Sequence, residues 1–169
     1  MMRFISQMFW FVGLILFQVL VLDNTHLFGL FIPIIYIYSL LRWPPDLPTP
    51  LAVVLGFVLG LAVDILSNTP GMHAAATTFI AFIRYPILRL FVLKEDLGNK
   101  DISIYTIGTN AFWKYAIILV FIHHAILFML EALSLTNGLM LLKIPICSIL
   151  TLVFIGALER INRKQDAKS

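Results

Sequence analysis

The sequence predicts an all-α, polytopic membrane protein, a single bundle of about six transmembrane helices. Three observations predict this class. Hydrophobic residues make up 60% of the chain and charged residues only 12%, whereas soluble domains carry about 25% charged residues. The apolar residues gather in long runs separated by short polar segments. These runs are apolar on every face, unlike the alternating strands of a membrane barrel, so helices must satisfy their backbone polar groups.

A helix needs about 20 apolar residues to cross a bilayer. The chain offers six such runs, at residues 4–22, 27–41, 51–66, 72–93, 112–133 and 139–158. The first run is longer than a signal-peptide core and no small-residue cleavage site follows it, so we expect a retained helix. Residues 102–111 are ambiguous between an interfacial segment and a pre-helix segment. We treat residues 1–169 as one integral membrane domain with a basic tail at 159–169.

The basic residues predict the orientation of the bundle. They lie near the two ends of the chain, in the loop after the second run, or in and around the loop between the fourth and fifth runs. These residues are Arg3, Arg42, Arg89, Lys94, Lys100, Lys114, Arg160, Arg163, Lys164 and Lys168. On the opposite side only Lys143 comes near the membrane edge. The positive-inside rule therefore predicts that both termini are cytoplasmic in a multi-pass protein. The net charge of +3 is explained by this pattern and does not indicate a nucleic-acid partner.

The loop after the second run is rich in proline, with four prolines in residues 42–50. Such a segment is stiff and cannot be helical. We expect it to fix the placement of the flanking helices, and it could present a rigid surface to a partner.

Asp64 is the most informative charged residue of the apolar runs. Gly56, Gly60 and Asp64 recur every four residues, so they share one helix face that permits close helix approach. We expect the carboxylate to accept hydrogen bonds from the turn that ends at Gly71 or from the start of the next helix, where negative charge is favoured. A proton, ion or lipid-headgroup site at Asp64 is the alternative.

Three further charged residues lie within or near the runs. Arg84 precedes Pro86, which releases the carbonyl group of Phe82, so we expect the arginine to reach that carbonyl or the inner headgroups by snorkelling. A buried contact with another helix or a partner is the alternative. Glu131 and Lys143 lie six residues either side of Asn137, so a hairpin would bring them to similar depth. A salt bridge between them is one reading, and two separate interfacial residues the other.

No catalytic, metal or cofactor site is predicted. His123 and His124 are adjacent, so they point about 100° apart on a helix and are poorly placed to share a metal. Neither has a carboxylate or cysteine three or four residues away, as a helical metal site requires. The chain lacks a phosphate loop, a zinc-protease motif and a dinucleotide fingerprint. Cys147 is the single cysteine, so no intramolecular disulfide can form.

The residues around Asp64 resemble one known family. Residues 55–76, LGFVLGLAVDILSNTPGMHAAA, are similar to the rod shape-determining protein MreD, whose glycine-rich third helix ends in an aspartate before a short turn. Residues 18–29, QVLVLDNTHLFG, look like the version found in Bacteroidota-type members. Length, helix count and tail also fit, so the resemblance covers nearly the whole chain. Ile32 departs from the polar residue expected there.

The resemblance implies a non-enzymatic component of the bacterial cell-elongation machinery in the inner (cytoplasmic) membrane. Such a protein would associate with the scaffold MreC and other elongation-machinery membrane proteins, and so couple MreB filaments to peptidoglycan synthesis. It implies a fold similar to the substrate-binding subunits of vitamin transporters. The alternative function is a small-molecule or lipid-binding transporter subunit, which would gather polar side chains near mid-membrane. His123, His124 and Gln18 are the residues available for that.

Overall fold

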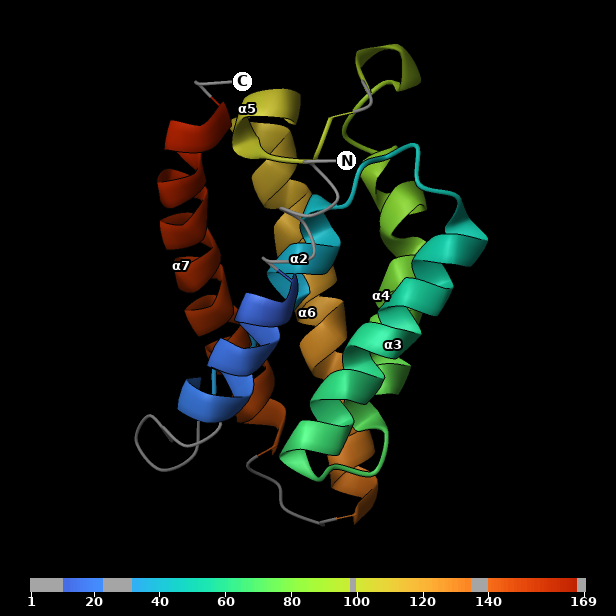
Figure 1. The fold of residues 1–169 in the computed structure, drawn as a ribbon, viewed down its shortest axis with the longest axis vertical. Coiled ribbons are helices and arrows are strands. Elements are labelled where there is room, and N and C mark those ends of the chain that lie inside the picture. Colours follow the sequence, from blue (N-terminus) through green and yellow to red (C-terminus); the bar gives the residue numbers. More distant parts are fainter. Residues whose placement is uncertain (1–10, 23–31, 98–99, 135–139, 167–169) are drawn as a thin grey trace.

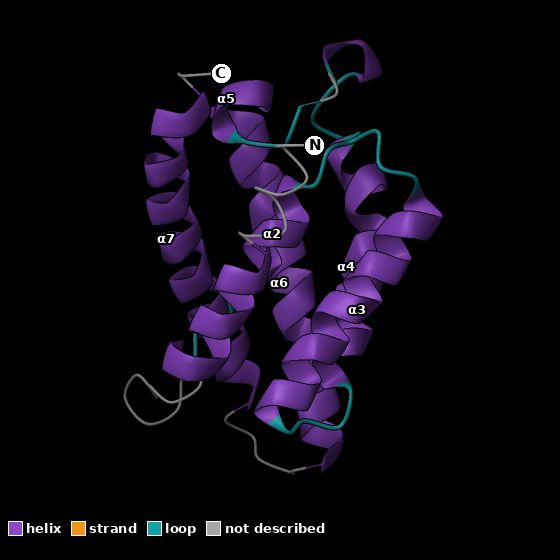
Figure 2. Cartoon of the chain, viewed as in Figure 1, coloured by secondary structure: helices purple, strands orange, loops and turns teal. Residues whose placement is uncertain are grey.

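The computed structural model describes residues 11–22, 32–97, 100–134 and 140–166, and these form an all-helical bundle (Figure 1). The described residues contain helices and loops and no strand (Figure 2). An apolar helix Phe11–Leu22 comes first, and its last five residues are the π-helix η1 (Gln18–Leu22). The remaining elements are α2 (Ile37–Arg42), α3 (Thr49–Ser67), α4 (Met72–Leu88), η2 (Lys94–Asp96), α5 (Ile104–Ile107), α6 (Thr109–Ser134) and α7 (Met140–Asp166).

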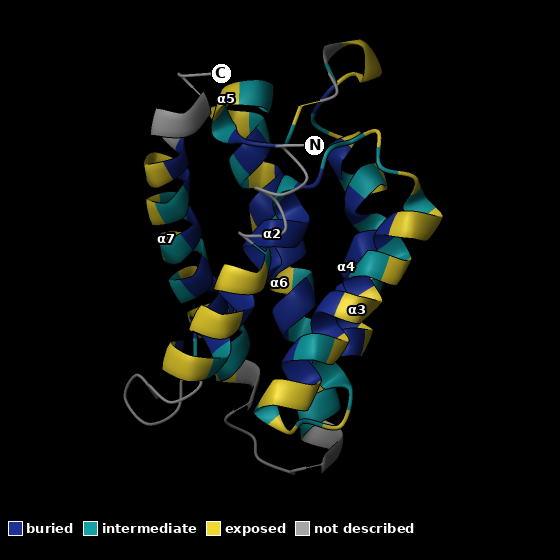
Figure 3. Cartoon of the chain, viewed as in Figure 1, coloured by how far each residue is buried: buried dark blue, intermediate teal, exposed yellow. Residues whose placement is uncertain are grey.

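Three helical stretches are long and apolar enough to cross a membrane. They are Thr49–Ser67, Thr109–Glu131 and Leu142–Asn162, which belong to α3, α6 and α7. The outward side chains of these helices are themselves apolar, as at Val54, Ile65 and Val153, which are more than half exposed (Figure 3). A soluble protein would leave few such large apolar patches uncovered. These helices therefore support the predicted helical membrane class.

The α3–α4 hairpin is the most closely packed pair of helices. A Cβ atom built on Gly56 would lie 2.7 Å from the Cβ of Ala81. One built on Gly60 would lie 2.5 Å from the backbone oxygen of His73. Only a residue without a side chain allows the two backbones to approach this closely. The predicted small-residue face is confirmed, and it packs against α4.

Most of the basic residues of the described chain lie toward one end of the bundle. The end of α2, the end of α4, the start of α6 and the end of α7 lie together in Figure 1, opposite the α3–α4 turn. Arg42, Arg89, Lys114 and Arg160 belong to these element ends. We call this the basic end. Lys143 lies in the first turn of α7, at the other end.

The second predicted run is not one continuous helix in its described part. Residues 32–35 are non-helical, and α2 begins only at Ile37. The backbone at Pro33 cannot donate a hydrogen bond, and a proline disfavours helical geometry in the residue before it. Residues 33–35 are nevertheless buried in the bundle. An interior stretch of this kind must find other partners for its backbone polar groups.

Two other boundaries differ from expectation. Helix α4 ends at Leu88, two residues after Pro86 and five before the predicted end of its run. Helix α7 continues to Asp166, so most of the expected tail at 159–169 is a helical extension. The reason is that Glu159 and Asn162 are buried and hydrogen-bonded against other elements, which keeps the helix docked beyond its apolar part.

A leucine at Gly60 tests the helix contact. We expect Gly60→Leu to lower the free energy of unfolding by about 1–3 kcal/mol, because the new side chain overpacks the α3–α4 contact. Gly13→Leu is the matched control, since a Cβ there meets no atom within 4 Å. Membrane abundance and thermal unfolding in detergent measure both. Equal losses in the two variants would contradict the packing account.

Candidate functional site: polar clusters inside the bundle

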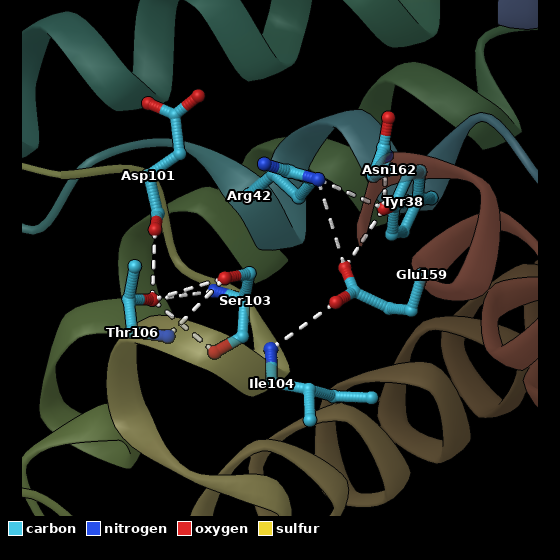
Figure 4. Close-up of polar contacts among 8 residues, drawn as sticks. All are labelled: Tyr38, Arg42, Asp101, Ser103, Ile104, Thr106, Glu159 and Asn162. Atoms are coloured by element: carbon cyan, nitrogen blue, oxygen red, sulfur yellow. Dashed lines mark hydrogen bonds and ion pairs between the residues drawn. The ribbon is translucent and has the colours of Figure 1, made fainter. Parts of the chain in front are cut away.

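Most of the buried polar side chains of the described residues lie at three places in the bundle, and Arg84 lies apart from them. The first is the Asp64 turn, which joins α3 to α4. The second, the interior cluster, surrounds the non-helical segment 32–36 and consists of Gln18, Tyr36, His73, His123, His124 and Thr151. The third, the Glu159 cluster, lies at the basic end and consists of Tyr38, Arg42, Glu159 and Asn162 (Figure 4).

Asp64 closes the α3–α4 turn. Its Oδ1 accepts hydrogen bonds from the Thr69 hydroxyl group and from the backbone N–H of His73, and its Oδ2 accepts one from the backbone N–H of Ala74. Asn68 and Gly71 supply the left-handed backbone conformations that the turn requires. The two backbone donors belong to the first turn of α4, where N–H groups have no partner in the helix. The expected hydrogen bonds of Asp64 are present, and all three donors come from the turn and the start of α4.

The interior cluster satisfies the backbone of the non-helical segment. The side-chain amide of Gln18 donates to the Pro33 carbonyl and accepts from the Ile35 N–H at 2.8 Å. The Ile34 N–H donates to the Thr151 hydroxyl group at 2.9 Å. Gln18 begins the π-helix η1, and Thr151 lies in the middle of α7. Two distant helices therefore supply the partners that a regular helix would have provided.

His124 and Thr151 form one part of this cluster. His124 Nδ1 lies 2.8 Å from the Val120 carbonyl group, which can only accept, so this nitrogen carries the proton of the neutral ring. His124 Nε2 then accepts from the Thr151 hydroxyl group at 3.3 Å. Thr151 thus accepts from the Ile34 N–H and donates to His124.

Tyr36 joins the other two histidines. Its hydroxyl oxygen lies 2.6 Å from His73 Nδ1 and 3.2 Å from His123 Nε2. One hydroxyl group has a single proton, so it donates to one ring and accepts from the other. The Nδ1 atom of His123 is buried and has no hydrogen-bond partner in the described part of the chain. His123 and His124 therefore have different partners, and no cluster of three or more metal-ligating side chains occurs among the described residues.

The Glu159 cluster ties α7 to α2 and α5 (Figure 4). Glu159 Oε1 accepts from the Tyr38 hydroxyl group at 2.8 Å and lies 3.8 Å from an Arg42 guanidinium nitrogen. Its Oε2 accepts from the backbone N–H of Ile104 at 3.1 Å, at the start of α5. The Asn162 amide donates to the Tyr38 hydroxyl group at 2.7 Å. Four residues and one backbone group therefore hold three elements together at the basic end.

Ser103 and Thr106 fix the start of α5 beside Glu159. The Ser103 hydroxyl group accepts from the Thr106 N–H, and the Thr106 hydroxyl group accepts from the Ser103 N–H, which is a capping box. The Thr106 hydroxyl group also donates to the Asp101 carbonyl group (Figure 4). The ambiguous residues 102–111 thus hold a capped four-residue helix and the start of α6.

Arg84 does not snorkel. It is buried, and its guanidinium group donates to the carbonyl groups of Trp43 and Pro44 in the proline-rich loop. The guanidinium carbon also lies 5.9 Å from the centre of the Trp43 ring. Burial of the charge costs free energy, and the two carbonyl groups offset part of that cost because they replace water around the guanidinium group. The alternative of a buried contact is therefore the one that the structure contains.

Glu131 and Lys143 form the expected pair. Their charged groups lie 3.4 Å apart, and both side chains are partly exposed. Residues 135–139, in the connection between α6 and α7, lie outside the described residues. Of the two alternatives left open by the sequence, the salt bridge between the two helices is the one that the structure contains.

Glu159 and Asn162 are functional candidates that sequence reasoning missed. Ser148, Thr151, Ile155, Glu159 and Asn162 recur at intervals of three or four residues and form one buried face of α7. That periodicity was the available signal.

Comparison with known protein families, with curated proteins and with solved structures found no match to this chain.

Matched substitutions at two glutamates test the Glu159 cluster. Glu159→Gln replaces one acceptor oxygen by an N–H₂ group, which then faces a donor, either the Tyr38 hydroxyl group or the Ile104 N–H. We therefore expect a loss of about 1–3 kcal/mol in the free energy of unfolding. Glu131→Gln makes the same chemical change in a partly exposed pair, where about 0–1 kcal/mol is expected. Thermal unfolding in detergent compares them. A Glu131 variant that is the less stable of the two would contradict this ranking.

Proposed function

We propose that this protein is a non-enzymatic membrane component of the bacterial cell-elongation machinery, of the rod shape-determining MreD type. The observation that carries the proposal is the α3–α4 hairpin. Gly56, Gly60 and Asp64, which carry the resemblance, are the residues that bring the two helices together and close their turn. A rigid hairpin of this kind would offer a fixed helix surface to another membrane protein.

The use of the buried charges supports a structural role. Asp64, Arg84 and Glu159 each bind backbone groups or side chains of other elements. Charges engaged in this way hold the helices in position. The proposal therefore assigns binding and positioning, with no catalytic step.

The finer features of the proposal follow from the sequence and the resemblance. The chain would cross the bacterial inner membrane six times with both termini in the cytoplasm, and its fold would resemble the substrate-binding subunits of vitamin transporters. Its partners would be the scaffold MreC and other elongation-machinery membrane proteins. It would thereby help to couple cytoskeletal filaments to peptidoglycan synthesis and so regulate cell shape.

Affinity purification from native membranes tests this proposal. The tagged full chain should recover an elongation scaffold protein after mild cross-linking. Gly60→Leu should reduce recovery per molecule of bait, because the hairpin surface is distorted, whereas Gly13→Leu should not. Failure of the unaltered chain to recover any elongation protein would contradict the proposal.

A second candidate function is the small-molecule or lipid-binding subunit. The specific observation in its favour is the buried non-helical segment at residues 32–36, which is bound by Gln18 and contacts His73 and His123 through Tyr36. Transporters place substrates and ions at interrupted helices. Mass spectrometry of the protein purified without delipidation distinguishes the two, since a stoichiometric small molecule would favour the binding subunit.

A further inference from the structure

A pocket opens between α5 and α7 at the basic end of the bundle. Its volume is about 720 Å³, and its lining includes Tyr105, Trp113, Gly156, Ala157 and Arg160. Tyr105, Ala157 and Arg160 are exposed, so the pocket is open at the surface. It is separate from the interior cluster.

The pocket is present because two residues of α7 that line it have little or no side chain. Gly156 and Ala157 form part of its lining, where a longer side chain would fill it. A Cβ atom built on Gly156 would already lie 3.2 Å from the Trp113 ring. The indole of Trp113 therefore lies directly against the α7 backbone, beside the open volume.

The exposed charge in the pocket lining comes from Arg160. Glu159 also belongs to the lining, but its carboxylate is bound by Tyr38, by Arg42 and by the Ile104 N–H. Both oxygens of the carboxylate are therefore already engaged by groups of the bundle. The guanidinium group of Arg160 is the charged group of the lining left exposed to a ligand.

The surface next to the pocket is apolar. Val153 and Ile161, which also line it, are each more than 60% exposed on α7. Aromatic residues such as Tyr105 and Trp113 favour the level of lipid headgroups. Basic pockets between membrane helices bind anionic headgroups, while the adjoining apolar surface suits an acyl chain.

We propose that this pocket binds one anionic phospholipid, with the phosphate group at Arg160 and an acyl chain passing Val153, Gly156 and Ala157 beside Trp113. A zwitterionic lipid lacks the net negative charge that an exposed guanidinium group selects. The site does not depend on the proposed function, because it rests on the pocket, its charge and its aromatic wall.

Fluorescence quenching of Trp113 by brominated lipids tests the proposal. The full chain is reconstituted in phosphatidylcholine vesicles containing either brominated phosphatidylglycerol or brominated phosphatidylcholine. The difference in quenching between the unaltered chain and Trp113→Phe gives the part of the signal that comes from Trp113. One basic group near an anionic lipid predicts about a fivefold preference for phosphatidylglycerol.

Two matched arginine variants complete the experiment. Arg160→Gln should reduce the preference to about one, whereas Arg89→Gln, at an exposed arginine of the same end outside the pocket, should retain it. Three results would each overturn the proposal. They are no lipid preference in the unaltered chain, an equal effect of both arginine variants, and a Trp113 that neither brominated lipid quenches because protein covers the pocket.

Discussion

The arrangement of the bundle depends on satisfying the backbone of a non-helical segment in its interior. Residues 33–35 are buried and non-helical, and Pro33 has no N–H group to contribute to a helix. Unpaired backbone groups in such a place are costly, so side chains from elsewhere must bind them. Gln18 and Thr151 do so, which fixes the first helix and α7 on either side of the segment. Tyr36 and Tyr38 then point from the next residues toward separate polar clusters.

This constraint explains why α7 has a polar interior face and an apolar outer face. Ser148, Thr151, Glu159 and Asn162 are buried, while Ile149 and Val153 are exposed. In a lipid environment the apolar face needs no protein partner, so polar contacts can hold the helix to the bundle. At the opposite side, α3 and α4 are held by close backbone approach and by Asp64. Two different kinds of contact therefore hold the two sides of the molecule.

The sequence predicted the features that depend on local pattern. Apolar run length predicted α3, α6 and α7, and four-residue spacing predicted that Gly56, Gly60 and Asp64 would face a neighbouring helix. The pair of Glu131 and Lys143 followed from hairpin symmetry. Each of these needs only residues close together in the chain or a single turn between two helices.

The features that it did not predict depend on contacts between distant residues. Arg84 has no nearby sequence signal for its two carbonyl partners, which lie about 40 residues earlier in the proline-rich loop. The non-helical residues before α2 were hidden because they are as apolar as those of a helix, and only Pro33 marked them. Glu159 looked like part of a solvated basic tail, since its partners Tyr38 and Ile104 come from other elements.

Exchange of the Ile34 backbone amide with solvent tests the central constraint most directly. Thr151→Val keeps the side-chain shape but removes the hydroxyl group that binds this amide, so its exchange should accelerate by about tenfold or more, as loss of one buried hydrogen bond implies. Thr78→Val is the matched control, because the Thr78 hydroxyl group donates only to the Ala74 carbonyl group within α4. The account predicts fast Ile34 exchange in the Thr151 variant alone. Unchanged protection of Ile34 in that variant would contradict it.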